Sequence, residues 1–341
     1  MNIRQINYPL YIGGALSLIL LALAIFGPSL APHDPMQVNG LMFIDGAAYA
    51  PPPLGRPLPP FISSDFALGL DVIGRDVLSR LLWAVRPTLV LCAAIVAVRV
   101  TLGVLLGVIA GWWGGRVGRL IDALIGISLS VPLLAFAVAA LLAIQLERGL
   151  LAFVVALSIT GWCDTAALVK SRTLAVRGAP YIESARAVGL RQGALLWRHV
   201  VPQLRPVLPV LIAFELSATL LLIAELGYLG YYIGGGFVYT YTVGNTDVQQ
   251  LLVTGAPELG QMLSDFFGQL YVTPWVSICA GILVFIALIA FALLGEGLRR
   301  RLDVTRPRRL SWRAWRQRVK PEGLASGRTQ RAPVGGEADA G

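Results

Sequence analysis

Six apolar runs, each long enough to cross a bilayer, alternate with polar segments along this chain of 341 residues. A helix rises about 1.5 Å per residue, so about 20 apolar residues cross a hydrocarbon core of about 30 Å. The runs are Leu10–Gly27, Thr88–Trp113, Ile121–Gln145, Leu150–Val169, Val207–Leu229 and Trp275–Leu294. This pattern predicts an all-α polytopic membrane protein with six transmembrane helices.

The first apolar run has a second interpretation. Met1–Pro9 carries one charge, Arg4, and Ser29-Leu30-Ala31 matches the small-residue pattern at which secretory signal peptides are cleaved. The run is long for a signal peptide and further runs follow it, which favours a retained helix. Residues 1–27 are therefore interpreted as an N-terminal segment and first span.

Composition agrees with a membrane protein, because 56% of the residues are hydrophobic and only 14% are charged. A net charge of +9 would otherwise suggest nucleic acid as a partner. However, twelve of the 28 basic residues lie from Arg299 onward and seven lie between Lys170 and Arg205, beside the apolar runs. Such clusters serve membrane topology, so nucleic acid is not a predicted partner.

The same charges predict the orientation. Residues 1–9, 114–120, 170–205 and 295–341 carry one, two, seven and twelve basic residues, whereas residues 231–273 carry none. Lys and Arg concentrate on the cytoplasmic side of membrane proteins, so both termini are predicted to be cytoplasmic. Residues 28–86 and 231–273 are predicted to be external.

Residues 28–86 have two parts. Nine prolines lie between Pro28 and Pro60, which predicts extended structure. A short amphipathic helix along the membrane interface is predicted by four apolar residues at helical spacing: Val77, Leu78, Leu81 and Leu82.

Residue types for covalent chemistry are few. Cys92, Cys163 and Cys279 lie far apart in apolar runs, and His33 and His199 are the only histidines. These positions indicate neither a disulfide framework nor a zinc or Ser-His-Asp site. No GxxxxGK[ST] phosphate loop occurs, so the chain is not itself a P-loop ATPase. We predict that it is not an enzyme and holds no cofactor or metal.

A polar, basic segment, Ala179–Pro202, separates the fourth and fifth apolar runs. Pro180 suits the first position of a helix, and Glu183 falls in its first turn, where a carboxylate is favoured. Gly189 is predicted to stop this helix, and a second helical run is predicted to end at Pro202. Two short helices joined by a glycine corner have a shape that fits a groove on another protein.

This segment resembles a known loop. Its landmarks have the spacing of the EAA loop of binding-protein-dependent ABC importers: Glu183, Ala185, Gly189 and Val201-Pro202. Residues 198–202 resemble the R-H-V-L-P ending found in the dipeptide/oligopeptide/nickel permease family. Ser184 and Val201 replace the usual Ala and Leu.

Two further blocks resemble the same family in the same order. Residues 69–82 resemble G-T-D-x-x-G-R-D-V-L-S-R-L, with Leu70 in place of Thr. The C-terminal segments Leu259–Leu263, Thr273–Trp275 and Leu294–Arg299 resemble W-G-x-M-L, A-P-W and L-L-G-D-G-L-R. One departure concerns the outer side, where a longer stretch, Tyr231–Thr254, replaces a short connection and leaves the solute open.

The resemblance implies the type I ABC importer permease fold, with residues 87–298 as its core, in a bacterial or archaeal plasma (inner) membrane. It implies a second homologous permease subunit, an external solute-binding protein, and two cytoplasmic ATPase subunits that bind ATP and Mg²⁺. The implied solutes are di- or oligopeptides, with nickel or another small solute as the alternative. The residues implied to contact the ATPase are Glu183, Ser184, Ala185, Arg186, Gly189, Arg191, His199 and Pro202.

Four charged residues lie inside apolar runs, where charge is costly and often functional: Arg99, Asp164, Glu215 and Glu225. One hypothesis is that they line a translocation path and contact charged ends of the solute. The alternative is a packing pair between helices, Arg99 with Asp164 or Glu215. Gly103 and Gly107 are interpreted as sites of close helix packing.

A self-sufficient channel or ion-coupled transporter is the competing class of function. It would use the intramembrane charges as a relay and would show internal repeats, of which we find no convincing case. The basic tail, residues 299–341, has three interpretations: a topology anchor, a patch on anionic lipid headgroups, or an ATPase contact. Trp312 and Trp315 suit a segment at headgroup level.

Overall fold

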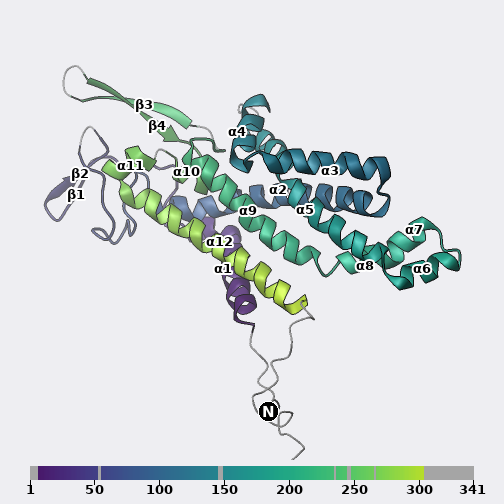
Figure 1. Cartoon of the computed structure of the whole chain (residues 1–341). Coiled ribbons are helices and arrows are strands. Elements are labelled where there is room, and N and C mark those ends of the chain that lie inside the picture. Colours follow the sequence, from purple (N-terminus) through teal and green to yellow (C-terminus); the bar gives the residue numbers. More distant parts are fainter. Residues whose placement is uncertain are drawn as a thin grey trace, which may run out of the picture. The chain divides into compact units, whose positions relative to one another are not determined.

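The structure, a computed structural model, describes residues 7–52, 55–144, 149–233, 236–243, 247–264 and 266–302 (Figure 1). The chain divides into two units, residues 1–302 and 303–341. The tail beyond Leu302, with the predicted headgroup-level Trp312 and Trp315, lies outside the described residues. Inner and outer denote below the cytoplasmic and external sides predicted from charge.

Five helices in the described part of the chain are long and apolar enough to cross a membrane. They are α1 (Tyr8–Leu30), α2 (Val77–Trp112), α5 (Leu150–Arg177), α9 (Leu208–Tyr228) and α12 (Pro274–Leu302). A further apolar stretch consists of two helices, α3 (Gly115–Ser130) and α4 (Leu133–Ile144). If this pair is one span, the number is six, as predicted.

The pair α3–α4 corrects the prediction of one straight span over residues 121–145, because the two helices are bent by 100°. Val131 precedes Pro132 and has an extended backbone, with φ −98° and ψ 133°. The ring of a proline clashes with the backbone of the residue before it and drives that residue out of the α region. Helix α3 therefore ends at Ser130, and α4 starts in a new direction.

The start of α1 and the end of α12 lie side by side. The side-chain amide of Asn7 donates a hydrogen bond to the carbonyl oxygen of Gly297 at 2.7 Å. If α1 and α12 each cross the membrane, the two described ends of this unit lie on the same side of it. Five crossings would leave them on opposite sides, so this contact supports α3 and α4 as a sixth crossing.

Helix α2 begins at Val77 rather than at Thr88, and it continues through Pro87. The carboxylate of Asp76 caps it by accepting hydrogen bonds from the backbone N–H groups of Leu78 and Ser79. The predicted interfacial helix and the second span are thus one element. Its outer turns do not lie along the interface, because the apolar side chains there pack against α10 and α12.

Glycines bring α2 and α5 close together. A Cβ atom added at Gly103, Gly107 or Gly111 would lie only 2.6–2.7 Å from atoms of α5. Residues at four-residue spacing share one helix face, so the three glycines form a continuous flat strip. The packing role predicted for Gly103 and Gly107 is confirmed.

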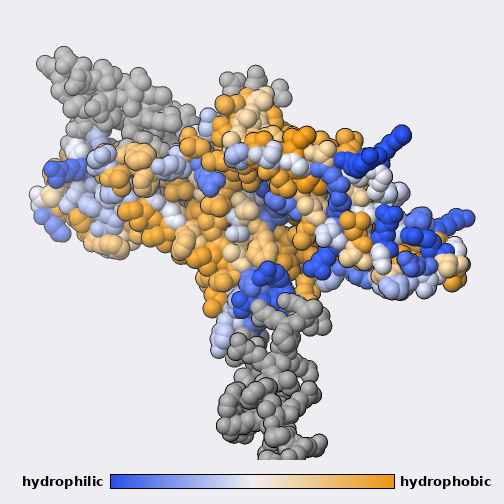
Figure 2. Space-filling view, viewed as in Figure 1, coloured by the Kyte–Doolittle hydropathy of each residue, from blue (hydrophilic) through white to orange (hydrophobic). Residues whose placement is uncertain are grey.

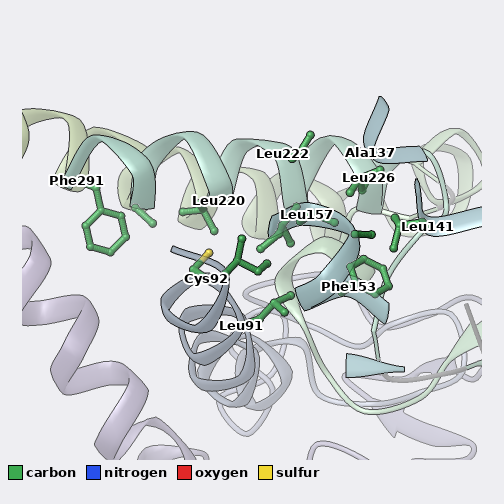
Figure 3. Packing of buried hydrophobic residues seen from close by; sticks show 14 of the residues in the cluster. Leu91, Cys92, Ala137, Leu141, Phe153, Leu157, Leu220, Leu222, Leu226 and Phe291 are labelled. Carbon is green, nitrogen blue, oxygen red and sulfur yellow. The ribbon is translucent and has the colours of Figure 1, made fainter. Parts of the chain in front are cut away.

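The largest apolar cluster lies where α2, α5 and α9 meet, as Figure 3 shows. Helices α4 and α12 add side chains at its edges. The cluster includes Leu91, Cys92, Ala137, Leu141, Phe153, Leu157, Leu220, Leu222, Leu226 and Phe291. The middle of the unit is thus held by apolar packing between spans that are far apart in sequence.

The proline-rich outer segment is folded. Strands β1 (Met42–Ile44) and β2 (Ala47–Tyr49) form a hairpin. Its turn residues, Asp45 and Gly46, both have positive φ (52° and 79°), as a type I′ turn requires. Behind the hairpin, Leu58, Phe66 and Leu70 form a small apolar cluster.

The second outer segment contains a longer hairpin and two short helices. Strands β3 (Gly236–Val243) and β4 (Asp247–Thr254) pair antiparallel, so the predicted insertion 231–254 holds β structure. Helices α10 (Leu259–Met262) and α11 (Phe266–Val272) follow and lead into α12.

Candidate coupling loop and buried charges

The 179–202 loop begins with helix α6 (Pro180–Ala187), and Glu183 lies in its first turn as predicted. The helix ends in a Schellman motif. The N–H of Leu190 donates to the carbonyl of Ala185, the N–H of Gly189 donates to that of Arg186, and Gly189 has φ +92°. The predicted glycine stop is confirmed, because this left-handed conformation suits glycine.

The second helical run differs from the prediction. It comprises α7 (Gln192–Leu195), a π-helical turn η2 (Leu196–Val200) and α8 (Val201–Leu204), so the chain stays helical beyond Pro202. Proline has no N–H and breaks the bonding pattern of a regular α-helix. The π-helical turn shifts this pattern just before Pro202. Pro202 then occupies the first turn of α8, where a backbone N–H has no partner within the helix, so the missing N–H of proline breaks no hydrogen bond.

An apolar cluster holds the loop against three spans. Three loop side chains, Ile182, Leu195 and Val200, are buried in it together with Leu204 at the end of α8. They pack with Trp112 at the inner end of α2, with Val169 and Val176 of α5, and with Leu211 of α9. The loop therefore contacts the inner ends of α2, α5 and α9 directly.

Polar contacts join the two halves of the loop. Gln203 Nε2 donates a hydrogen bond to the hydroxyl of Tyr181 at 2.6 Å. The rings of Tyr181 and His199 lie 6.0 Å apart between centroids. The half-buried His199, in the second helical run, therefore faces Tyr181 of α6 and contacts the loop itself.

The outward side of the loop is charged, and hydrophilic residues gather over α6–α8 in Figure 2. Six of the predicted contact residues are exposed: Glu183, Ser184, Arg186, Gly189, Arg191 and Pro202. Ala185 is half-buried. Sequence reasoning missed two exposed apolar residues on the same loop, Val188 and Trp197, which are 82% and 70% exposed. Apolar residues between charges inside a basic segment are the signal that identifies them.

Arg99 is buried at the junction of α2, α5 and α9. Its Nε donates a hydrogen bond to the carbonyl of Leu157 at 2.7 Å, and its Nη1 lies 3.6 Å from Glu215 Oε2. Glu215 also accepts a hydrogen bond from Thr165 Oγ1 at 2.9 Å. Of the two partners considered for Arg99, Glu215 is therefore the one that the structure places against it.

The other two intramembrane charges lie apart from this pair. Asp164 is exposed on α5 and Glu225 is half-buried near the outer end of α9. Neither makes a hydrogen bond or ion pair within the described residues. The structure thus joins two of the four predicted path residues and leaves two at the surface of the chain.

A buried polar cluster at the outer end of α2 was not predicted. Asp71 accepts hydrogen bonds from the backbone N–H and Nε of Arg75, and its Oδ2 lies 3.7 Å from Arg80 Nε. Arg80 donates further hydrogen bonds to Pro35 O and to Gln261 Oε1. The signal in the sequence was the run of charges at 71–80 directly before an apolar helix.

Glu258 belongs to the same outer region and is also buried. Its carboxylate caps α10, accepting hydrogen bonds from the N–H groups of Gly260 and Gln261, and it accepts a third from Thr88 Oγ1. Burial raises the pKa of the Glu258 carboxyl, and these three donors lower it part of the way back. The contact with Thr88 ties α10 to α2.

Comparison with known proteins agrees with this arrangement. The model of a family described as "Binding-protein-dependent transport system inner membrane component" matches residues 103–304, more than half of the chain. The glutathione transport system permease protein GsiD of Pectobacterium atrosepticum is 30% identical over 292 residues, 85% of each chain. The dipeptide transport system permease protein DppC of Haemophilus influenzae is 29% identical over 292 residues, 86% of this chain and 89% of that protein. This chain therefore belongs to the family of inner membrane components of binding-protein-dependent transport systems.

Proposed function

We propose that this chain is a permease subunit of an ABC importer for peptides and that its 179–202 loop couples it to a cytoplasmic ATPase. The observation that carries the proposal is the double character of the loop. One side is buried against the inner ends of α2, α5 and α9, and the other exposes charged and apolar groups. A segment built this way can bind a partner outside the membrane and pass its movement to three spans.

The proposed assembly has a second permease subunit, two ATPase subunits and an external solute-binding protein. ATP and Mg²⁺ bind to the ATPase subunits. Closure of the ATPase pair moves the loop, and the spans switch between two packed arrangements that open to opposite sides. The two similar permeases are named for glutathione and dipeptides, which favours a peptide over nickel as the solute.

Val188→Glu tests the docking role of the loop. Val188 is 82% exposed, so the substitution removes little packing within the chain, but it places an unpaired charge in the proposed interface. The chain is purified in mild detergent from cells that also produce the ATPase and the second permease. We expect the second permease to be recovered and the ATPase to be lost.

Phe43→Glu is the matched control, because Phe43 is 73% exposed on the outer hairpin and takes the same new charge. This variant should retain the ATPase. Recovery of the ATPase with Val188→Glu at the wild-type level would contradict docking through this loop.

A further inference from the structure

The charges at the centre of the spans do not sum to zero. Arg99 and Glu215 neutralise each other, and Asp164 adds a negative charge close enough to interact electrostatically with both. With one positive and two negative groups, the net charge of this cluster is −1 when all three are ionised. A cation beside Asp164 would balance it.

Glu215 is not the group that lacks a partner. Its Oε1 accepts a hydrogen bond from Thr165 and its Oε2 faces the guanidinium of Arg99, so both oxygens act as acceptors. This arrangement suits an ionised carboxylate, which is an acceptor only. The unbalanced negative charge thus belongs to Asp164.

Arg99 directs its donors elsewhere. The Nε donates to Leu157 O, the Nη1 to Thr219 Oγ1 at 3.3 Å, and the Nη2 to Thr160 Oγ1 at 3.4 Å. Its side chain is 1% exposed and cannot turn outward without breaking these bonds. The positive charge of Arg99 therefore offsets part of the negative charge of Asp164. The carboxylate of Asp164 is exposed and can still bind another cation.

Asp164 lies within the apolar part of α5. It is 14 residues after Leu150 and five before Val169, the ends of the predicted fourth span, so it is about 8 Å from the nearer end. A carboxylate inside hydrocarbon is costly, and such residues face the interior of a bundle or a water-filled cavity. The surface of α5 around Asp164 is therefore better suited to face protein or an aqueous path than lipid.

We propose that Asp164 lines the translocation path and binds the α-ammonium group of the imported peptide. This inference rests on the proposed function, import of peptides. An α-ammonium is the cation that an unmodified peptide carries whatever its side chains, so one carboxylate serves many sequences. Because Arg99 offsets part of its field, Asp164 holds the ammonium weakly enough for release, as a conducting path requires.

The first test is uptake by the complete transporter in liposomes, with the binding protein, both permeases, the ATPases and ATP. Dialanine and glutathione are the probes. We expect Asp164→Asn to lower the maximal uptake rate at least about tenfold, the effect of losing one charge-assisted hydrogen bond. Asp164→Glu keeps the charge and should retain most of the activity.

Leu168→Asn is the matched control. Leu168 lies one turn further along α5, is also exposed, and gains the same amide. It should transport at close to the wild-type rate. An equal loss in Asp164→Asn and Leu168→Asn would show that a polar amide on this face, rather than a missing charge, causes the defect, and would overturn the inference.

The second test asks whether the position is in water. Asp164→Cys is introduced with Cys163→Ala, and the assembled transporter is treated with a trimethylammonium-bearing methanethiosulfonate, a reagent that does not enter lipid. We expect the thiol introduced by Asp164→Cys to be labelled, and saturating dialanine to slow the labelling. Failure of the reagent to label this thiol would overturn the inference.

The outcomes separate this inference from the proposed function. If the wild type imports neither peptide in an ATP-dependent manner, the proposed function fails. If the wild type imports peptides and Asp164→Asn imports them equally well, only the role of Asp164 is overturned. If Asp164→Asn does not assemble whereas Asp164→Glu does, the missing cation belongs to the neighbouring subunit, and the role of Asp164 is again overturned.

Discussion

The two ends of α2 both pack against apolar clusters, but they differ in the polar contacts that accompany this packing. At the outer end, charged and polar groups around Arg80 and Glu258 are buried and bonded to one another. At the inner end, Trp112 packs in an apolar cluster with the 179–202 loop. Hydrogen bonds and ion pairs need defined geometry, whereas apolar packing is non-directional. We therefore expect the outer end to be the more rigid of the two, and the inner end to be the one that repacks if the loop moves.

Arg80→Leu should have the largest effect. It removes the charge next to Asp71 and leaves the acceptors on Pro35 and Gln261 without this donor. Loss of one partner in a buried charged network typically costs about 3–5 kcal/mol. We expect a clear drop in the thermal unfolding midpoint of the purified permease. Arg86→Leu, at an exposed position of the same helix, is the control and should change the midpoint little; equal midpoints for the two variants would contradict a rigid outer end.

Ile182→Ala tests the apolar packing between the loop and the inner end of α2. Ile182 is fully buried between α6 and the spans, so truncation leaves a cavity that costs about 2–4 kcal/mol. Because the proposed contacts with the ATPase lie on the exposed side of α6, we expect the ATPase to bind but transport per ATP hydrolysed to fall. Unchanged transport per ATP in reconstituted vesicles would show that this packing does not transmit movement.

Glu258→Gln tests the buried polar contacts at the outer end of α2. The amide cannot accept at both atoms that now take N–H donors, so one buried donor loses its partner at a cost of about 1–3 kcal/mol. In the wild type the raised pKa of Glu258 means that the folded state favours the protonated acid. Its contribution to stability is full below the pKa of the unfolded chain and is lost as the pH rises through the raised value. Unfolding midpoints measured from about pH 4 upward, near the unperturbed pKa of Glu, should show this decline in the wild type and a flatter profile in Glu258→Gln.

Gly189→Ala should have the smallest effect, about 1 kcal/mol, because alanine is strained at φ +92° but has open space around it. The strain acts on the Schellman motif alone. We expect weaker ATPase binding with only a small drop in the unfolding midpoint, and Gly193→Ala, on the same loop without positive φ, should lower neither quantity.

Much of the fold is readable from the sequence because the bilayer leaves few alternatives. Long apolar runs must become helices, and the glycine stop at 189 and the packing glycines at 103 and 107 follow from local geometry. Two features were misjudged at prolines. Pro132 breaks a span that hydropathy shows as continuous, whereas Pro87 and Pro202 lie within helical stretches. A π-helical turn precedes Pro202 and accommodates it.

The candidate site was predictable where it depends on spacing and not where it depends on the rotation of helices. The loop residues follow a motif, so Glu183 was placed correctly in the first turn of α6 and Gly189 at the stop that follows this helix. The choice of Glu215 over Asp164 as the partner of Arg99 depends on which way α5 and α9 face, and a single sequence does not contain that information.

Gly161 of α5 lies directly against the buried side chain of Arg99, and this contact limits which substitutions the protein can accept. The guanidinium lies where a Cβ atom at position 161 would be, so any larger residue there would expel it. Substitution of Gly161 alone would leave Arg99 and Glu215 without their shared arrangement. The three positions are therefore expected to be replaced together in divergent descendants, and a chimaera that inherits only one of them should fail to accumulate in the membrane.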